Sequence, residues 1–363
     1  MVAGAFLPRT VGQAEGGTTN PKDAGRPLVA VTMGDPAGIG PEVVIRALTD
    51  ENLPRDVSII VVGSRGLLEE RAGRFSLPFD PRSVAEPEEC QQTAGLPALY
   101  EPEGLELSGL ELGVASPRGG RASLAYIDQA VDWALAGRVE ALVTGPINKE
   151  ALSLTGCAYP GHTELLASRT GSRRATMMLV GGGLRVALAT THVPLRRVAG
   201  LLSTERLVTT IQVTDEALRE WFGVSGPRIA VCALNPHAGD GGRLGTEDAT
   251  TVAPAVAEAR AKGVTCEGPL PADALFYHAK QGRYDAVVAL YHDQGLIPVK
   301  LLAFEEAVNV TLGLPIIRTS VDHGTGYDIV SRGVASCQSL VEAVKLAAAF
   351  IKRRQSKQGL FSP

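Results

Sequence analysis

The chain has 363 residues, of which 45% are hydrophobic and 20% are charged, and its net charge at pH 7 is −4. This length predicts one large domain or two medium ones, and the charge shows no basic excess of the kind that binds nucleic acid. No run of about 18 apolar residues indicates a membrane span.

The predicted elements begin after a polar N-terminal stretch. Residues 1–26 are rich in Gly, Thr and Pro and predict a flexible tail without a secretory signal. Residues 29–32 read as a short buried strand, which leads into the glycine-rich loop 34–40. Pro41 then occupies a plausible first helical position. Residues 57–63 and 141–145 are apolar runs typical of buried parallel strands.

The middle of the chain continues this alternation. "TMMLVG" and "RVALAT" predict paired strands that meet at a glycine turn. Residues 204–223 predict a helix that ends at Gly223. "RIAVCAL" and "DAVVALY" predict strands, while 246–262, 271–281 and "SLVEAVKLAAAFIKRR" predict helices.

Strands and helices therefore alternate almost throughout, which predicts an α/β fold with a largely parallel sheet. At this length we expect two α/β/α subdomains with a cleft between them. We place residues 27–145 and 295–363 in the first subdomain and residues 146–294 in the second. The five cysteines are scattered and form no C-x-x-C pair, which predicts reduced thiols and a cytoplasmic protein.

Three of the predicted strands lead into a histidine. They reach His192, His237 and His292, and ligands gather at the carboxyl ends of strands in such sheets. Three imidazoles with an open coordination position form a catalytic metal site. The alternative is that each histidine caps its own strand by bonding to backbone. The glycines that follow His237 let a ligand approach the backbone closely, or simply form a turn.

Cationic residues follow in the last third of the chain. Lys300 and Arg318 lie beside apolar runs, with Asn309 between them. Lys and Arg bind phosphate or carboxylate, Arg in a fork geometry. The alternative for each is a solvated surface charge. "GDPAGIGPE" has the wrong spacing for a Rossmann fingerprint, so it predicts only a glycine-rich strand-to-helix loop.

Seven motifs in order resemble one family. They are "VTMGDPAGIGPEV", "TGPINKEAL", "YPGHTELLA", "TTHVPL", "LNPHAGDGG", "YHDQGLIPVK" and "IRTSVDHGTGYDI". Together they span about residues 28 to 335 and resemble the 4-hydroxythreonine-4-phosphate dehydrogenase family of vitamin B6 biosynthesis.

The resemblance implies a divalent metal (zinc, magnesium or cobalt) bound by three histidines and shared across a homodimer. On this sequence the ligands are His192, His237 and His292. It also implies contacts with a phosphorylated hydroxy-acid substrate. Those fall on His162, Thr163, Lys300, Asn309 and Arg318.

Two loops also resemble those of isopropylmalate and isocitrate dehydrogenases, which implies a fold of that kind and a non-Rossmann site for NAD or NADP. On this sequence the site involves His323, Gly324 and Asp328. Within the family, "TMGDPAGIGPE" and "GPINKEAL" look closer to the paralogues that act on 4-phospho-D-threonate or 4-phospho-D-erythronate. The "GHTE" segment disfavours a third branch, the dihydrodiol dicarboxylate dehydrogenases.

All three branches oxidise a secondary hydroxyl near a carboxylate, and the resulting β-keto acid loses CO2. Asp273, Lys149 and Asp293 are the candidates for the general base. Each could instead orient a histidine ligand, and Asp273 could serve the N-terminus of its helix. The rival functions are a zinc hydrolase or lyase that works without NAD, and a non-catalytic protein that binds a small molecule.

Overall fold

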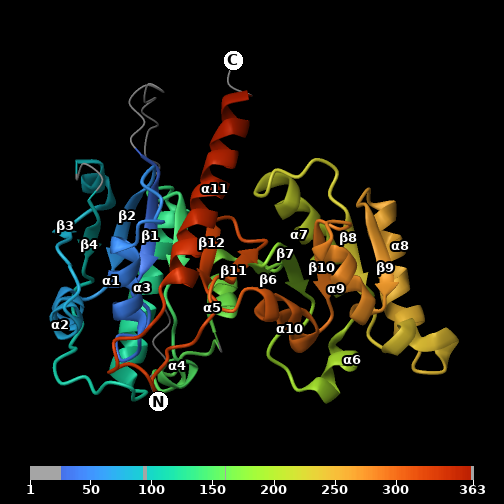
Figure 1. Cartoon of the computed structure of the whole chain (residues 1–363), viewed down its shortest axis with the longest axis horizontal. Helices are drawn as coiled ribbons and strands as arrows, with labels where there is room; N and C mark the ends of the chain where they lie inside the picture. Colours follow the sequence, from blue (N-terminus) through green and yellow to red (C-terminus); the bar gives the residue numbers. More distant parts are fainter. Residues whose placement is uncertain (1–25, 93–95, 160, 361–363) are drawn as a thin grey trace, which may run out of the picture.

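The computed structural model describes residues 26–92, 96–159 and 161–360. The expected flexible tail, apart from its last residue, lies outside this part of the chain. The described strands form a single 12-stranded sheet that crosses the whole molecule (Figure 1). In sheet order they are β3 (Arg82–Ser83), β4 (Ala98–Tyr100), β2 (Ser58–Val62), β1 (Leu28–Thr32), β5 (Ala141–Thr144), β12 (Ile317–Val321), β11 (Val308–Leu312), β6 (Thr176–Gly181), β7 (Leu184–Leu188), β10 (Ala286–Ala289), β8 (Ile229–Cys232) and β9 (Cys266–Leu270).

The sheet has two parallel parts joined by antiparallel strands. The strands from β3 to β12 run parallel, and so do β7, β10, β8 and β9. Between them, β11 and β6 run antiparallel to their neighbours. The predicted α/β class with a largely parallel sheet is confirmed. The predicted hairpin is also confirmed, because β6 and β7 meet at Gly182 and Gly183, both of which have positive φ.

Helices connect most of the strands. They are α1 (Gly40–Thr49), α2 (Arg65–Phe75), α3 (Pro117–Leu135), α4 (Lys149–Ser153), α5 (His162–Thr170), α6 (Val198–Leu201), α7 (Thr204–Glu220), α8 (Ala253–Ala261), α9 (Ala272–Lys280), α10 (His292–Leu302) and α11 (Gln338–Leu360). The longest of them, α11, packs along β12 and β5, and its last turns extend beyond the sheet (Figure 1). Among the described helices, none combines the length and the apolar character needed to cross a membrane.

The division into two subdomains stays a prediction. Its boundary after residue 294 falls inside α10, which begins at His292. Helix α10 was not predicted, because Gly295 and Pro298 are poor helix formers. Gly295 lies on the side of α10 that packs against β7, where an added Cβ would come within 2.7 Å of the Leu188 side chain.

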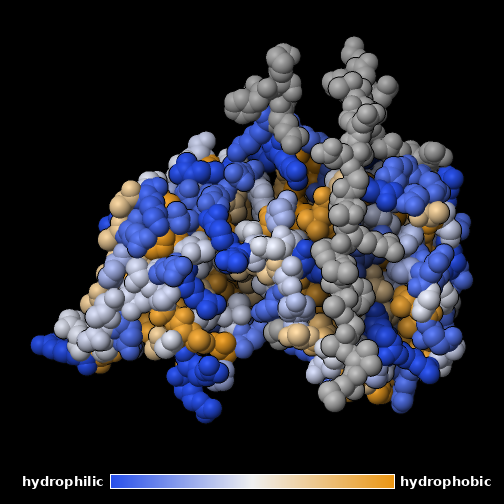
Figure 2. Space-filling view, turned by 180° about the vertical axis from the view of Figure 1, so that it is seen from behind, coloured by the Kyte–Doolittle hydropathy of each residue, from blue (hydrophilic) through white to orange (hydrophobic). Residues whose placement is uncertain are grey.

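The central strands are buried, as their continuous apolar runs predict. All five residues of β1, β2 and β12 are buried, but β12 differs in its composition. It carries Arg318, Thr319 and Ser320 inside the core, and buried polar groups of this kind need partners. On the face seen in Figure 2, hydrophilic side chains dominate and hydrophobic patches between them are small.

Close backbone contact joins the loops that follow β1 and β5. Gly34 has φ +77°, and an added Cβ would lie 2.3 Å from the carbonyl oxygen of Pro146. The next amide, that of Asp35, donates to the same oxygen at 2.8 Å. Only glycine fits this conformation and this distance. The glycine-rich loop is therefore fixed against the end of β5, where the candidate site begins.

Candidate active site

One hollow of about 320 Å³ brings together most of the predicted site residues. It lies where loops after β5, β7, β10 and β12 meet α5 and α10. The predicted residues that line it are Lys149, His162, Thr163, His192, His292, Lys300, Asn309, Arg318, His323 and Gly324. Four other predicted residues, His237, Asp273, Asp293 and Asp328, do not line it.

A pair of histidines forms one part of the hollow. The ring centroids of His192 and His292 lie 5.4 Å apart. Burial lowers the pKa of His192, and the nearby Lys149 and His292 lower it further, so its imidazole is neutral at pH 7. Neutral imidazoles bind divalent metal ions. Within the described residues no group of three or more His, Cys, Asp or Glu converges as a metal site, so this chain alone offers two of the three predicted ligands.

Asp293 is placed to orient His292. Its Oδ1 lies 2.7 Å from His292 Nδ1, and its own side chain is largely exposed. A hydrogen bond at Nδ1 fixes the tautomer and leaves Nε2 free for a metal ion. This geometry favours the orienting role of Asp293 over the role of base.

We predict that Asp293→Asn lowers metal affinity without changing the fold. The expected loss is about 10- to 100-fold, which is typical when the partner of a metal-binding histidine is changed. Metal titration followed by calorimetry measures this loss, with Asp80→Asn as a control at an exposed position outside the hollow. Unchanged affinity would mean that Asp293 does not orient a ligand.

His237 lies away from the histidine pair of its own chain. It follows β8 and is exposed, with φ +52° in a left-handed segment that continues through Gly241. Buried Asp248 holds the start of this loop, since its carboxylate accepts the amides of Leu234 at 2.7 Å and Asn235 at 3.0 Å. Left-handed backbone costs about 1–2 kcal/mol for each non-glycine residue. The loop thus holds His237 outward in a costly conformation.

Within the described part of the chain, five buried polar atoms of side chains that line the hollow have no hydrogen-bond partner. They are His162 Nε2, Asn309 Oδ1, Arg318 Nε, Asp322 Oδ2 and His323 Nε2. Most buried polar groups in proteins are satisfied, because leaving one unpaired costs about 1–3 kcal/mol. Their concentration here indicates a site built for a polar ligand.

Arg318 supplies a buried positive charge. Its side chain donates to Thr311 Oγ1 at 2.9 Å and to Thr144 Oγ1 at 2.5 Å, and the residue is only 1% exposed. Burial lowers its pKa to about 9, and no carboxylate of the described residues offsets this effect. Burial and the charge of Arg318 also hold the pKa of His162 well below its ordinary value. This part of the hollow therefore has an uncompensated cation.

Asp322 is a site residue that the sequence analysis missed. It directly follows β12, lines the hollow and has its Oδ2 3.1 Å from Lys300 Nζ. The available signal was an acidic residue directly before His323 and Gly324, at the exit of a buried strand. Glu164 was missed as well and lines the same hollow beside Thr163.

Two of the three predicted cofactor residues lie in the hollow and the third lies outside it. His323 and Gly324 line the hollow, and a Cβ added at Gly324 would meet nothing within 4 Å, which leaves room for a ligand. Asp328 is exposed outside the hollow. Between them, Tyr327 donates its hydroxyl to buried Asp35 at 2.6 Å. The glycine-rich loop after β1 thereby anchors the loop after β12.

The three base candidates differ in position. Lys149 lines the hollow as the first residue of α4. Asp273 is exposed in the first turn of α9, where an acid favours the helix N-terminus. Of the three, only Lys149 reaches this hollow from the same chain.

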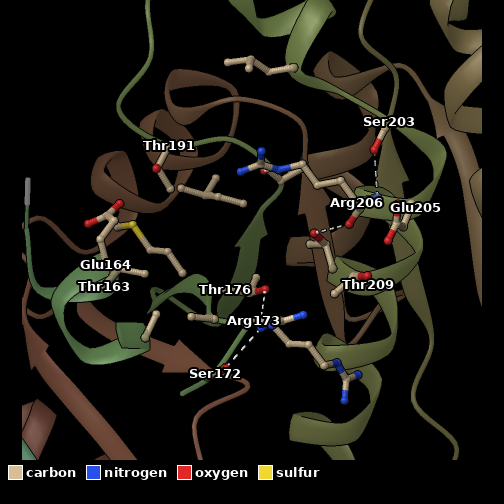
Figure 3. A pocket seen from close by; sticks show the side chains of 18 residues that line it. Thr163, Glu164, Ser172, Arg173, Thr176, Thr191, Ser203, Glu205, Arg206 and Thr209 are labelled. Carbon is tan, nitrogen blue, oxygen red and sulfur yellow. Dashed lines mark hydrogen bonds between the residues drawn. The ribbon is translucent and has the colours of Figure 1, made fainter. Parts of the chain in front are cut away.

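A second hollow of about 530 Å³ adjoins the first and shares Thr163, Glu164 and Met177 with it. Figure 3 shows Glu164 and Thr191 on one side of it and Ser203 and Arg206 on the other. Thr191 directly precedes His192 in the chain. A loop that enters the second hollow could therefore contact Thr191, the residue next to His192 in the sequence.

A mixed α/β sheet with histidines and cations around one hollow is typical of an enzyme. The chain belongs to the family of the pyridoxal phosphate biosynthetic protein PdxA, whose model matches residues 55–347. It is a dehydrogenase of this family. The resemblance carried by the seven motifs is confirmed.

Known relatives agree with this assignment. The chain is 45% identical over 323 residues to a 4-hydroxythreonine-4-phosphate dehydrogenase of Desulforapulum autotrophicum, covering 89% of this chain and 95% of the relative. It is 42% identical over 320 residues to a D-threonate 4-phosphate dehydrogenase of Salmonella typhimurium, covering 88% and 97%. A crystal structure of a 4-hydroxythreonine-4-phosphate dehydrogenase from Klebsiella pneumoniae superposes with a TM-score of 0.81 at 42% identity, covering 91% of this chain and 99% of that one.

Proposed function

We propose that the protein oxidises and decarboxylates a 4-phosphorylated hydroxy acid of the 4-phosphooxy-L-threonine type, using a divalent metal ion and NAD or NADP. The observation that carries this proposal is Arg318, a buried cation that has no acidic partner among the described residues and lines the same hollow as the histidine pair. A phosphate group would compensate that charge. His162, Thr163 and Asn309 line the hollow too and would add hydrogen bonds to the substrate.

A second candidate is a 4-phospho-D-threonate or 4-phospho-D-erythronate dehydrogenase. It is supported by the relative from Salmonella typhimurium, whose identity to this chain is close to that of the first relative. It is also supported by the Met33-Gly34-Asp35 segment, which resembles that branch. The same buried cation and the same histidine pair would serve either substrate.

The proposed metal ion is zinc, magnesium or cobalt. His192 and His292 fit two of its ligands, because one is neutral and close to the other and Asp293 orients the second. When bound, a divalent ion would lower the pKa of the substrate hydroxyl and stabilise negative charge on its oxygen. The residues of this chain would hold the hydroxyl end of the substrate beside the histidine pair and its phosphate at Arg318.

The third proposed ligand, His237, would come from a second copy of the chain. The exposed face of α10 supports this homodimer. Ile297 is 64% exposed and Leu301 84%, both on the helix that begins with His292, and Phe304, two residues after that helix ends, is 75% exposed. Apolar side chains exposed this fully on one helix are typical of an interface. The second hollow, next to His192, offers room for the partner's loop.

The proposed NAD or NADP would accept the hydride. His323 and the open position at Gly324 support a site at this end of the hollow, with Asp328 farther along the same loop. Lys149 is the proposed base from this chain, and Asp273 is a candidate only if the partner supplies it. The cytoplasm is the proposed location, which the scattered cysteines without a C-x-x-C pair support.

A substrate panel tests the proposal. Purified protein is mixed with metal, NAD or NADP and one of three acids: 4-phospho-L-hydroxythreonine, 4-phospho-D-threonate or 4-phospho-D-erythronate. We expect NADH or NADPH and CO2 to form with one of them, and a chelator to stop the reaction. Product without reduced cofactor would point to a metal hydrolase or lyase. Binding without turnover would point to a non-catalytic binding protein.

A further inference from the structure

Two of the cations that line the hollow, Lys300 and Arg318, differ in their electrostatic surroundings. The Arg318 side chain is buried and, among the residues that the structure describes, donates to the hydroxyls of Thr311 and Thr144 alone. Lys300 Nζ instead lies 3.1 Å from the Asp322 carboxylate. One charge is uncompensated and the other is neutralised by a neighbour. Two such groups do not serve one dianionic phosphate equally well.

The Asp322 carboxylate is held firmly in place. Its side chain is only 9% exposed, and its backbone amide donates to Ser339 Oγ at 3.1 Å. Ser339 is itself buried and donates to the carbonyl of Ala307 at 2.7 Å. Lys300 also approaches the backbone carbonyl of Asp322, at 3.4 Å. The ammonium group is thus fixed at the exit of β12 by two oxygens of one residue.

The pair lies at the histidine end of the hollow. Lys300 lies on α10, whose first residue is His292, and both side chains line the hollow, whereas Arg318 lies on β12 and bonds to Thr311 and Thr144. Burial raises the pKa of Asp322, and Lys300 partly offsets this effect. The Oδ2 atom accepts no hydrogen bond of normal geometry, although the ammonium is close. The ion pair therefore retains capacity to bind a further polar group.

We propose that Asp322 is a positioning residue that holds the Lys300 ammonium at the reacting end of the substrate, next to His292, so that Arg318 carries the phosphate. This inference rests on the proposed oxidation of a phosphorylated hydroxy acid. Lys300 then donates to the hydroxyl or carboxylate oxygen of the substrate, where negative charge develops during oxidation. An ammonium group that is fixed and paired with a carboxylate orients the substrate oxygen without adding net charge to the hollow.

The test compares Asp322→Asn with Arg318→Met and Lys300→Met. Asp322→Asn keeps the size of the side chain and removes its charge. We expect it to lower kcat about 100-fold, the scale of a displaced catalytic contact, while KM for the phosphorylated substrate changes less than about threefold. Asp322→Glu should restore part of kcat. Asp80→Asn is the matched control for removal of an exposed carboxylate.

A binding measurement without turnover completes the test. Inorganic phosphate is titrated calorimetrically into wild type and the variants, after circular dichroism and thermal melting have shown that each is folded. We expect Asp322→Asn and Lys300→Met to keep phosphate binding and Arg318→Met to lose it. If phosphate binding is lost with Lys300→Met, or is absent from wild type, the division of roles is wrong. An unchanged kcat in Asp322→Asn also overturns it.

The two proposals fail separately. If no phosphorylated hydroxy acid is oxidised by wild type, the proposed function is wrong, yet the phosphate titrations still report which cation binds phosphate. If oxidation occurs and Asp322→Asn raises KM as strongly as Arg318→Met does, the proposed function stands and the positioning role of Asp322 falls.

Discussion

Replacing His237 by alanine is expected to remove the bound metal ion and to lower kcat at least about 1000-fold, because metal binding supplies several kcal/mol of charge stabilisation. This effect is expected although His237 lies outside the hollow of its own chain. The exposed left-handed loop should keep its shape, since Asp248 and the glycines hold it. Metal content, kcat and circular dichroism check the prediction. Stoichiometric metal with normal kcat would contradict it.

Mixing two inactive variants tests whether the site is shared. His237→Ala lacks the outward histidine, and His292→Ala lacks one member of the inner pair. In a mixed dimer one site keeps His192 and His292 from the first chain and His237 from the second. Random mixing should therefore restore about a quarter of wild-type activity, given the two equivalent sites of a twofold dimer. If mixing restores nothing, all three ligands come from one chain or His237 is not a ligand.

Arg318→Met is expected to raise KM for the phosphorylated substrate by about 100-fold or more, because losing one partner of a buried charge pair costs about 2–5 kcal/mol. Methionine keeps much of the volume of arginine, so the strand should remain packed. The same change should alter KM for the dephosphorylated analogue less than about threefold, since that analogue leaves the cation unused in both proteins.

Steady-state kinetics with both substrates measure this difference. Arg118→Met, at an exposed position outside the hollow, is the control for removing an arginine. A thermal melt separates loss of binding from loss of stability. Equal changes in KM for the two substrates would show that Arg318 does not bind phosphate.

Local sequence patterns predicted much of the fold. The runs that became β1, β2, β8 and β10 were recognisable because buried parallel strands are short and continuously apolar. The helix that became α11 was equally clear from its length and periodicity. Strand β11 and its antiparallel pairing with β6 and β12 were not predicted, because the direction of a buried strand depends on its partners.

The candidate site was predictable in its histidines and cations but less so in its acids. Three histidines at strand exits were visible in the sequence, yet the separation of His237 from the other two depends on a left-handed loop that no periodicity reveals. Asp322 was missed because its importance lies in one contact with Lys300, 22 residues earlier in the chain. Asp273 looked like a base, but in its own chain it is an exposed residue at the start of a helix.

The position of β12 in the sheet has a consequence for how the protein is made. Strands β11 and β12 come near the end of the chain, yet they lie between β5 and β6 in the middle of the sheet. During synthesis the edges of β5 and β6 therefore stay unpaired until residues 308–321 have left the ribosome. Arg318, Asn309 and Asp322 arrive with those strands, so the hollow is among the last features to form. A nascent chain stalled before them presents open sheet edges, which are the surfaces that chaperones must protect from aggregation.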